Sequence, residues 1–253
     1  MTETHEDILS RLRGVVVDSA ASGRQLPTER ELCQHLGVSR TTLREHLQAL
    51  EVVGLLRRDQ GRGTFLQAPD GIALGNLLDL ALVADEVSVG DLTYVRRVLE
   101  RESAALCSGR LSAEDHARMT GLCAQMRAAL PAQQIASADH EFHMVLLQGS
   151  GNAALALLGV MLSQSLHRSM LSMRTFIASD RPTQLEMARA HERILDAVVA
   201  DDPDRAWKEM DHHFILSGRI ARRLAGQERQ GAVASSDDRS SDVPGSSDRA
   251  ARG

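Results

Sequence analysis

The sequence predicts a mainly α-helical fold, with an N-terminal winged helix-turn-helix that carries a small β-hairpin wing and a C-terminal antiparallel α-helical bundle. Three observations support this prediction. Residues 26–66 read in order as helix, tight turn, helix and hairpin. Residues 76–225 have helical periodicity almost throughout. Aromatic residues make up only 2% of the chain, so the core must be built from aliphatic side chains, a composition that favours helices.

The N-terminal elements follow from local signals. A first helix is expected over residues 6–21, where apolar residues recur on one side. Thr28 and Glu31 form a T-x-x-E capping box, which satisfies free backbone N–H groups at the start of a second helix. Gly37 ends that helix, because glycine tolerates the left-handed backbone of a helix stop. Ser39 is a favourable N-cap for the third helix.

The third helix has two different faces. Leu43, Leu47 and Leu50 form an apolar stripe for the core, while two arginines and two threonines gather in its first turns. Helix-turn-helix proteins contact bases with the first residues of this helix, and arginine can donate two hydrogen bonds to guanine. The alternative is that these polar residues form a solvated face. Because the caps, the turn, the stripe and the hairpin agree, we interpret this segment as DNA-binding.

A β-hairpin is expected directly after the third helix. Residues 55–58 read as one strand, residues 59–63 as a Gly-rich turn and residues 64–66 as the return strand. Arg57, Arg58 and Arg62 would give this wing a positive rim for phosphates. Residues 24–66 contain seven arginines and five acidic residues, an excess too small to matter without the placement of the arginines.

The rest of the chain is expected to be helical. Residues 67–75 contain Pro69 and Gly71 and are interpreted as a linker between a DNA-binding domain at 6–66 and an effector-binding and dimerisation domain at 76–225. Caps and breaks predict helices over about 88–108, 112–131, 133–148, 152–178, 182–200 and 202–224. Residues 226–253 are polar and rich in serine, which predicts a disordered tail.

Composition restricts the setting in which the protein works. No apolar run approaches the roughly 20 residues needed to cross a bilayer, so no membrane partner is expected. The first seven residues are polar and acidic, which does not resemble a secretory signal. Cys33, Cys107 and Cys123 have unrelated spacings, which favours reduced thiols and a cytoplasmic protein.

Four polar residues interrupt the apolar stripes of the predicted bundle. Asp139 and His143 lie one turn apart on one helix, His191 lies on another, and His213 lies on the last. One carboxylate and three imidazoles could converge on a divalent metal, with zinc or nickel preferred and manganese a further candidate. The alternative is a set of core histidines satisfied by hydrogen bonds, which periodicity alone favours.

The segment from Leu26 to Leu66 resembles the winged helix-turn-helix of the GntR family of bacterial transcription regulators. The resemblance is carried by L-P-T-E-R-E-L, G-V-S-R-T-T-L-R-E and G-x-G-T-F. It implies DNA contacts from Arg30, Ser39, Arg40, Thr41, Thr42 and Arg44, and a wing tip in the minor groove made of Gln60, Gly61, Arg62 and Gly63. The family's usual P-G before the first leucine is replaced by residues 22–25, so the resemblance does not set the conformation of that loop.

The helical part is similar to the FCD ligand-binding domain of the FadR subfamily. The similar stretches are D-x-x-F-H from Asp139, the run from Glu186 to Val198, M-x-x-H from Met210, and V-R-x-x-L-E from Val95. The resemblance implies that Asp139, His143, His191 and His213 bind a metal and that Arg96 holds the carboxylate of a small effector. From the sequence alone, an ion pair between Arg96 and Glu100 at the surface is an equal alternative.

These features together predict a homodimeric repressor or activator, not an enzyme, that binds a double-stranded palindromic operator and responds to a small carboxylate through a metal site. Two alternatives remain open at this stage. One is a regulator that senses an acyl group without a metal. The other is a metal-dependent enzyme fused to a DNA-binding domain, since a site with open metal positions can activate water.

Overall fold

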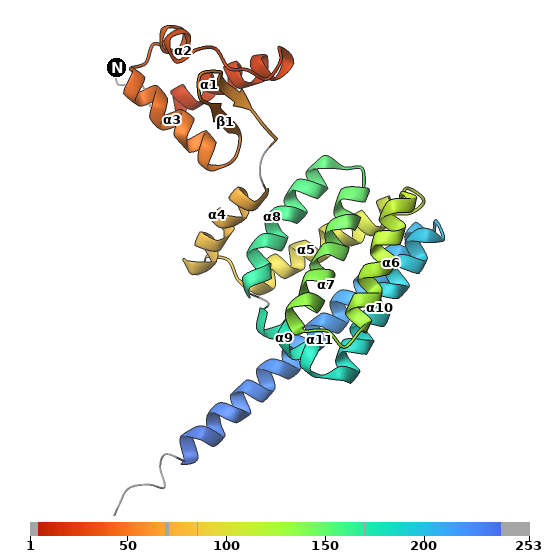
Figure 1. Ribbon diagram of the computed structural model, residues 1–253. Coiled ribbons are helices and arrows are strands. Elements are labelled where there is room, and N and C mark those ends of the chain that lie inside the picture. The colour runs from red at the N-terminus through yellow and green to blue at the C-terminus, as the bar shows by residue number, and fades with distance from the viewer. Residues whose placement is uncertain (1–4, 69–70, 85, 170, 239–253) are drawn as a thin grey trace, which may run out of the picture.

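The computed structural model describes residues 5–68, 71–84, 86–169 and 171–238. The chain forms eleven helices and one two-stranded antiparallel sheet in these residues. The mainly α-helical fold predicted from the sequence is therefore confirmed. Figure 1 shows a small winged domain at one end and a larger helical bundle next to it. Within the described residues, none of the helices combines the length and the apolar character that crossing a bilayer requires.

The winged domain consists of α1 (His5–Ala21), α2 (Glu29–Leu36), α3 (Arg40–Val52), β1 (Leu56–Asp59) and β2 (Gly63–Leu66). The predicted caps are present: Thr28 and Glu31 form a reciprocal capping box, and the Ser39 hydroxyl accepts a hydrogen bond from the Thr42 amide. Gly37 ends α2 with φ 67°, in the left-handed region. Leucines from α1, α2, α3 and both strands pack into one core: Leu12, Leu32, Leu36, Leu43, Leu47, Leu56 and Leu66.

The loop before α2 pairs with the wing. Arg24 has φ 65°, the Leu26 amide donates to the Thr64 carbonyl at 2.9 Å, and the Leu66 amide donates to the Arg24 carbonyl at 2.6 Å. An isolated bridge joins Gln25 and Phe65 in antiparallel sense. These bonds extend the hairpin by a short third segment. They also define the conformation of the loop at residues 22–25, which the family resemblance did not predict.

The helical domain contains eight helices in the described residues: α4 (Gly71–Val83), α5 (Val89–Cys107), α6 (Ala113–Arg127), α7 (Ala132–Gly149), α8 (Ala153–Ser169), α9 (Leu171–Ser179), α10 (Arg181–Val199) and α11 (Pro203–Asp238). The core between α5, α6, α7, α10 and α11 is built mostly from aliphatic side chains and methionine, with Phe142 and Phe214 as its aromatic members. The buried neighbours in this core hold the candidate metal ligands in fixed positions, namely Asp139, His143, His191 and His213.

Three boundaries differ from the sequence prediction. Helix α4 begins at Gly71, inside the predicted linker 67–75, because the leucine-rich segment that follows packs against α8. Within the single helix expected over 152–178, α8 is described to Ser169 and α9 from Leu171, with residue 170 outside the described part, and α9 packs on α7, α10 and α11. Helix α11 continues to Asp238, whereas the sequence predicts that the last helix ends near residue 224 and that a disordered tail begins at residue 226. Residues 239–253 lie outside the described part.

Candidate nucleic-acid interface and metal centre

Helix α3 presents its first turn to solvent. Arg40, Thr41 and Arg44 are exposed at its start, while Leu43 and Leu47 face the domain core. Thr42 is half-buried, and its hydroxyl lies 2.8 Å from that of the capping Ser39. The amphipathic pattern thus turns the two arginines and Thr41 outward, whereas Thr42 takes part in the cap itself.

The remaining predicted DNA-binding residues also lie on the surface. Arg30 and Ser39 are exposed, and so is the whole wing tip from Gln60 to Gly63. Gly61 and Gly63 have φ of 75° and 114°, and the Arg62 amide donates to Asp59 at 3.0 Å to close the turn. The structure therefore brings recognition helix and wing tip together in one domain with polar groups outward, while their contact with DNA stays a prediction.

Acidic partners orient the arginines of this surface. Arg44 Nε lies 2.9 Å from Glu29 Oε2, and Arg58 Nε lies 2.6 Å from Glu51 Oε1. These pairs are exposed or half-exposed, so each contributes little to stability. Their effect is to hold one guanidinium group beside Glu29 at the start of α2 and the other beside Glu51 in the last turn of α3.

Gln25 supports the wing and was not selected from the sequence. Its Nε2 donates to the Arg62 carbonyl at 2.9 Å, and a Cβ on Gly63 would lie 2.9 Å from the same nitrogen. The positive φ of 114° favours glycine at position 63, while a Cβ there would meet only the flexible end of the Gln25 side chain. A long-range contact of this kind has no signal in local sequence spacing.

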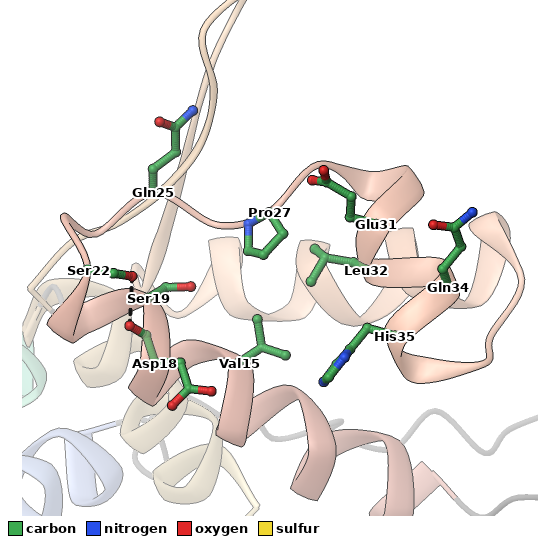
Figure 2. A pocket seen from close by; sticks show the side chains of 10 residues that line it. All are labelled: Val15, Asp18, Ser19, Ser22, Gln25, Pro27, Glu31, Leu32, Gln34 and His35. Atoms are coloured by element: carbon green, nitrogen blue, oxygen red, sulfur yellow. Dashed lines mark hydrogen bonds between the residues drawn. The ribbon is translucent and has the colours of Figure 1, made fainter.

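A separate groove of about 580 Å³ lies between α1 and α2. Figure 2 shows Leu32 and Val15 at its floor, Asp18 and Glu31 at its edges, and the Ser22 hydroxyl bonded to the backbone of Asp18. None of the ten predicted DNA-binding residues lines this groove, so it is distinct from the candidate interface.

The four predicted metal ligands come together inside the helical domain. Asp139 and His143 extend from α7, His191 from α10 and His213 from α11, and each offers one ligand atom within 4.8 Å of the others. All three imidazoles are buried, while Asp139 is partly exposed. Asp139 Oδ1 lies 3.2 Å from His191 Nε2 and 3.9 Å from His143 Nε2. The ring centre of His213 lies 4.5 Å from that of His191 and 4.9 Å from that of His143.

Hydrogen-bond acceptors fix which nitrogen of two imidazoles faces the cluster. His191 Nδ1 lies 2.9 Å from the Met187 carbonyl oxygen, and His143 Nδ1 lies 2.6 Å from Glu100 Oε2. Both partners only accept, so both Nδ1 atoms carry the proton and both Nε2 atoms have a free lone pair. The two Nε2 atoms lie 3.4 Å apart. Lone pairs at this distance repel one another unless a cation lies between them.

Glu100 and Arg96, both on α5, stand behind His143. Arg96 is buried and its Nε lies 2.5 Å from Glu100 Oε1. The ion pair between Arg96 and Glu100 that the sequence suggested as an alternative is present, but it is buried and does not lie at the surface. Burial alone would raise the pKa of Glu100, but Arg96 and His143 lower it to about 2, so the carboxylate stays ionised.

Burial lowers the pKa of two of the histidines, whereas it acts to raise that of Glu100. It lowers the pKa of His143, although Glu100 works against this shift. Burial lowers the pKa of His213 well below its usual value, and the neighbouring His191 and His143 add to the shift. Neutral imidazoles are the form that binds metals. The Nδ1 atom of His213 is buried and has no hydrogen-bond partner in the described part of the chain. The donor set therefore fits a divalent metal ion.

A small cavity adjoins this cluster. It has a volume of about 30 Å³ and lies beside Asp139 and His191, with apolar walls from α6, α7, α9 and α10. Its apolar lining includes Met126, Ile135, Ile177 and Met187. Arg96 does not line it; the guanidinium carbon instead lies 5.4 Å from the ring centre of Phe214, the residue after His213. The predicted effector role of Arg96 is not tested by this placement.

Glu100 is the residue of this site that the sequence reasoning did not select. It appeared only as the possible partner of Arg96, because an i, i+4 spacing of opposite charges is common on exposed helix faces. The signal available was its position in the same V-R-x-x-L-E stretch as Arg96. Its contact with His143, which is 43 residues further along the chain, requires the packing of α5 on α7.

A winged helix-turn-helix joined to a helical domain with a buried polar site defines a DNA-binding regulator with a ligand-binding domain. Comparison with family models agrees. Residues 5–66 match the model described as bacterial regulatory proteins, gntR family, and residues 91–215 match the FCD domain. The chain therefore belongs to the GntR family of bacterial transcription regulators and carries an FCD domain.

Several characterised or solved proteins are similar to this chain. The HTH-type transcriptional regulator LutR of Bacillus subtilis is 29% identical, over 78% of this chain and 93% of its own length. The putative L-lactate dehydrogenase operon regulatory protein of Escherichia coli is 27% identical, over 83% of each chain. The structure of GntR from Streptococcus agalactiae superposes with a TM-score of 0.58 and 26% identity, over 85% of this chain and 98% of that chain.

Proposed function

We propose that this regulator acts as a homodimer whose two winged domains bind the two halves of a palindromic operator, and that a small carboxylate bound at a metal centre controls this binding. The observation that supports the proposal most directly is the convergence of Asp139 and three histidines in the domain attached to the winged domain. A binding site in that position can change DNA affinity only if its ligand favours one arrangement of the two winged domains over another.

The donor set favours zinc or nickel. Three imidazoles and one carboxylate are borderline ligands, which suit these metals better than magnesium or calcium, whose preferred ligands are oxygens. Four protein ligands leave positions for an added ligand on a metal with five or six coordination sites. The carboxylate of an effector would complete the coordination there.

Charge balance favours an effector with a single negative charge. The buried charges of Arg96 and Glu100 cancel, and Asp139 cancels one of the two charges of a divalent metal. One positive charge then remains in the interior, where an unbalanced charge is costly. A monocarboxylate would neutralise it. Arg96 Nη2 is buried and has no hydrogen-bond partner in the described residues, so it is a free donor for such a group.

The cavity favours a small acid. A volume of about 30 Å³ accommodates only a few atoms, and its walls are mostly apolar. This size argues against an acyl chain and thus against the metal-free acyl sensor. The name of the Escherichia coli relative refers to an L-lactate dehydrogenase operon, and L-lactate carries the single negative charge that this site favours.

The exposed side of α4 supports a dimer. Leu77, Leu80 and Val83 are exposed on α4, and Leu158 is exposed on α8, the helix packed against it. Contiguous exposed leucines are uncommon on monomers and often mark interfaces between proteins. A second copy of the chain would cover this side and set the spacing of the two winged domains.

The test uses duplexes selected by the purified zinc-loaded protein from a random pool at moderate salt. We expect a palindromic sequence to be enriched and its binding to change when L-lactate is added, but not when methyl lactate, which lacks the carboxylate, is added. Arg44→Ala should weaken this binding, whereas Arg118→Ala, which removes an exposed arginine of the helical domain, should leave it unchanged and is the control for loss of charge. Binding with no preference over random competitor would contradict the regulatory proposal, and an equal response to both compounds would contradict the carboxylate.

A further inference from the structure

Each carboxylate oxygen of Glu100 lies close to a different partner. Oε1 lies 2.5 Å from Arg96 Nε, and Oε2 lies 2.6 Å from His143 Nδ1. Glu100 is fully buried, so water does not compete for either oxygen. One side chain therefore connects a candidate metal ligand on α7 with an arginine one turn away on α5.

The contact with His143 determines what that imidazole can do. An ionised carboxylate accepts the proton of Nδ1, which leaves the lone pair on Nε2, the nitrogen that faces Asp139 and His191. A metal-binding histidine is commonly oriented in this way by a carboxylate behind it, and loss of such a partner typically weakens metal affinity by about 10–100-fold.

The contact with Arg96 fixes the guanidinium in turn. Its Nε is occupied by Glu100, its guanidinium carbon lies over Phe214, and its Nη2 stays unpaired in the described residues. Any movement of Arg96 toward a new partner on Nη2 pulls on Oε1 of the same carboxylate that orients His143. Phe214 also contacts His213, with ring centres 5.5 Å apart, so the arginine lies close to a second candidate ligand.

We propose that Glu100 is a positioning residue that orients His143 for the metal and holds Arg96 at the same time, so that the state of Arg96 is transmitted to the metal centre through this one carboxylate. The inference rests on the proposed metal site. It adds a residue outside the four ligands and a route by which occupation of Arg96 changes metal coordination.

The first test measures zinc affinity by competition with a chromogenic chelator, and coordination geometry by the visible spectrum of the cobalt-substituted protein. We expect Glu100→Gln to weaken zinc binding by about 10–100-fold and to change the cobalt spectrum. The amide keeps the size of the side chain but offers an acceptor to only one of the two partners. Glu102→Gln is the matched control, because Glu102 is exposed on the same helix and bonds to Trp207. It should change neither measurement.

A double-mutant cycle then tests the connection to Arg96. We expect Arg96→Lys, which keeps the charge but loses the geometry of Nε, to weaken zinc binding in the wild-type background. The same change should have no further effect in the Glu100→Gln background, because the connection is already broken. If Glu100→Gln does not fold, as judged by circular dichroism, Glu100→Asp takes its place, since the shorter side chain cannot reach both partners.

The outcomes separate the two proposals. If His191→Ala loses zinc while Glu100→Gln keeps wild-type affinity and spectrum, the metal site stands and the role of Glu100 is wrong. If Arg96→Lys and Glu100→Gln have independent effects on zinc affinity, the connection through Glu100 is wrong. Should His191→Ala retain zinc, the proposed metal site fails, and the role of Glu100 fails with it.

Discussion

Some polar residues of the winged domain also stabilise its fold, so replacing them would test folding as well as DNA binding. Arg44 has a side chain that is 64% exposed, and its ion pair with Glu29 lies at the surface. Thr42 is tied to the cap of α3, and Gln25 holds the wing tip. Arg44 is therefore the residue where a substitution tests DNA contact with the least effect on folding.

We expect Arg44→Ala to weaken binding to a selected operator by about 1–3 kcal/mol and to relax base preference at one position of each half-site, because a bidentate contact to guanine is lost. Fluorescence anisotropy with the operator and with single-base variants measures both effects. Circular dichroism should be unchanged. Equal losses for every base variant would indicate a phosphate contact instead.

Among the metal ligands, His191 offers the clearest single substitution. Its Nδ1 bonds to the Met187 carbonyl of its own helix, and in the described residues its one ring contact outside the cluster is with Phe142 on α7, whose ring centre lies 4.9 Å away. We expect the purified variant to contain no zinc by mass spectrometry. His212→Ala is the matched control, because His212 is exposed on α11 beside His213 and should leave the metal content unchanged. Full retention of zinc in the His191 variant would remove this residue from the site.

At the scale of helices and strands, local sequence signals predicted the ends of elements correctly where one residue type has a strong effect on the backbone. The capping boxes before α2 and α5 and the glycine after α2 all lie where the sequence predicts them. The sequence was less informative where packing decides. Gly71 suggested a linker, yet α4 begins there because its leucines bury one side against α8.

The candidate metal ligands illustrate the same division. Periodicity placed each polar residue on an inward face, but it could not distinguish a satisfied histidine from a ligand. The pattern grouped the four residues as a possible site, the family resemblance favoured metal binding, and the structure supplied the distances. Neither the periodicity nor the resemblance identified Glu100, because its contact with His143 depends on how two helices far apart in the sequence are packed.

Helix α4 carries a prediction about assembly. We expect Leu80→Glu to shift a dimer toward monomer, because a charged side chain would be buried in the proposed interface. Analytical ultracentrifugation measures the change. Val199→Glu is a suitable control, since Val199 is an exposed apolar residue on α10, away from this side. An unchanged dimer in Leu80→Glu would mean that another surface joins the two copies.

The molecule as a whole combines a small aliphatic core in the winged domain with a bundle whose interior contains ionisable groups. The stability of the bundle should therefore depend on pH and on metal, while that of the winged domain should depend on neither to the same extent. Burial keeps His143 and His213 neutral in the folded protein, with pKa values below those of the unfolded chain.

This difference in pKa predicts the direction of the pH effect in the metal-free protein. Below a pH of about 6.5 the unfolded chain binds protons that the folded bundle does not bind. The free energy of unfolding is therefore highest above that pH and decreases as the pH falls below it. Urea unfolding of chelator-treated protein at several pH values measures it. His213→Leu should show a weaker dependence, and an equal slope in both proteins would contradict the contribution of His213.

The length of α11 has a mechanical consequence. The helix carries His213 within the bundle and continues as one unbroken element to Asp238, and Figure 1 shows its last turns projecting well clear of the other helices. Apolar side chains of α11 are packed in the core as far as Leu224. The 14 residues from there to Asp238 span roughly 21 Å at about 1.5 Å per residue. A tilt of α11 by about 5° about Leu224 would therefore move Asp238 by about 2 Å, as follows from the same rise per residue.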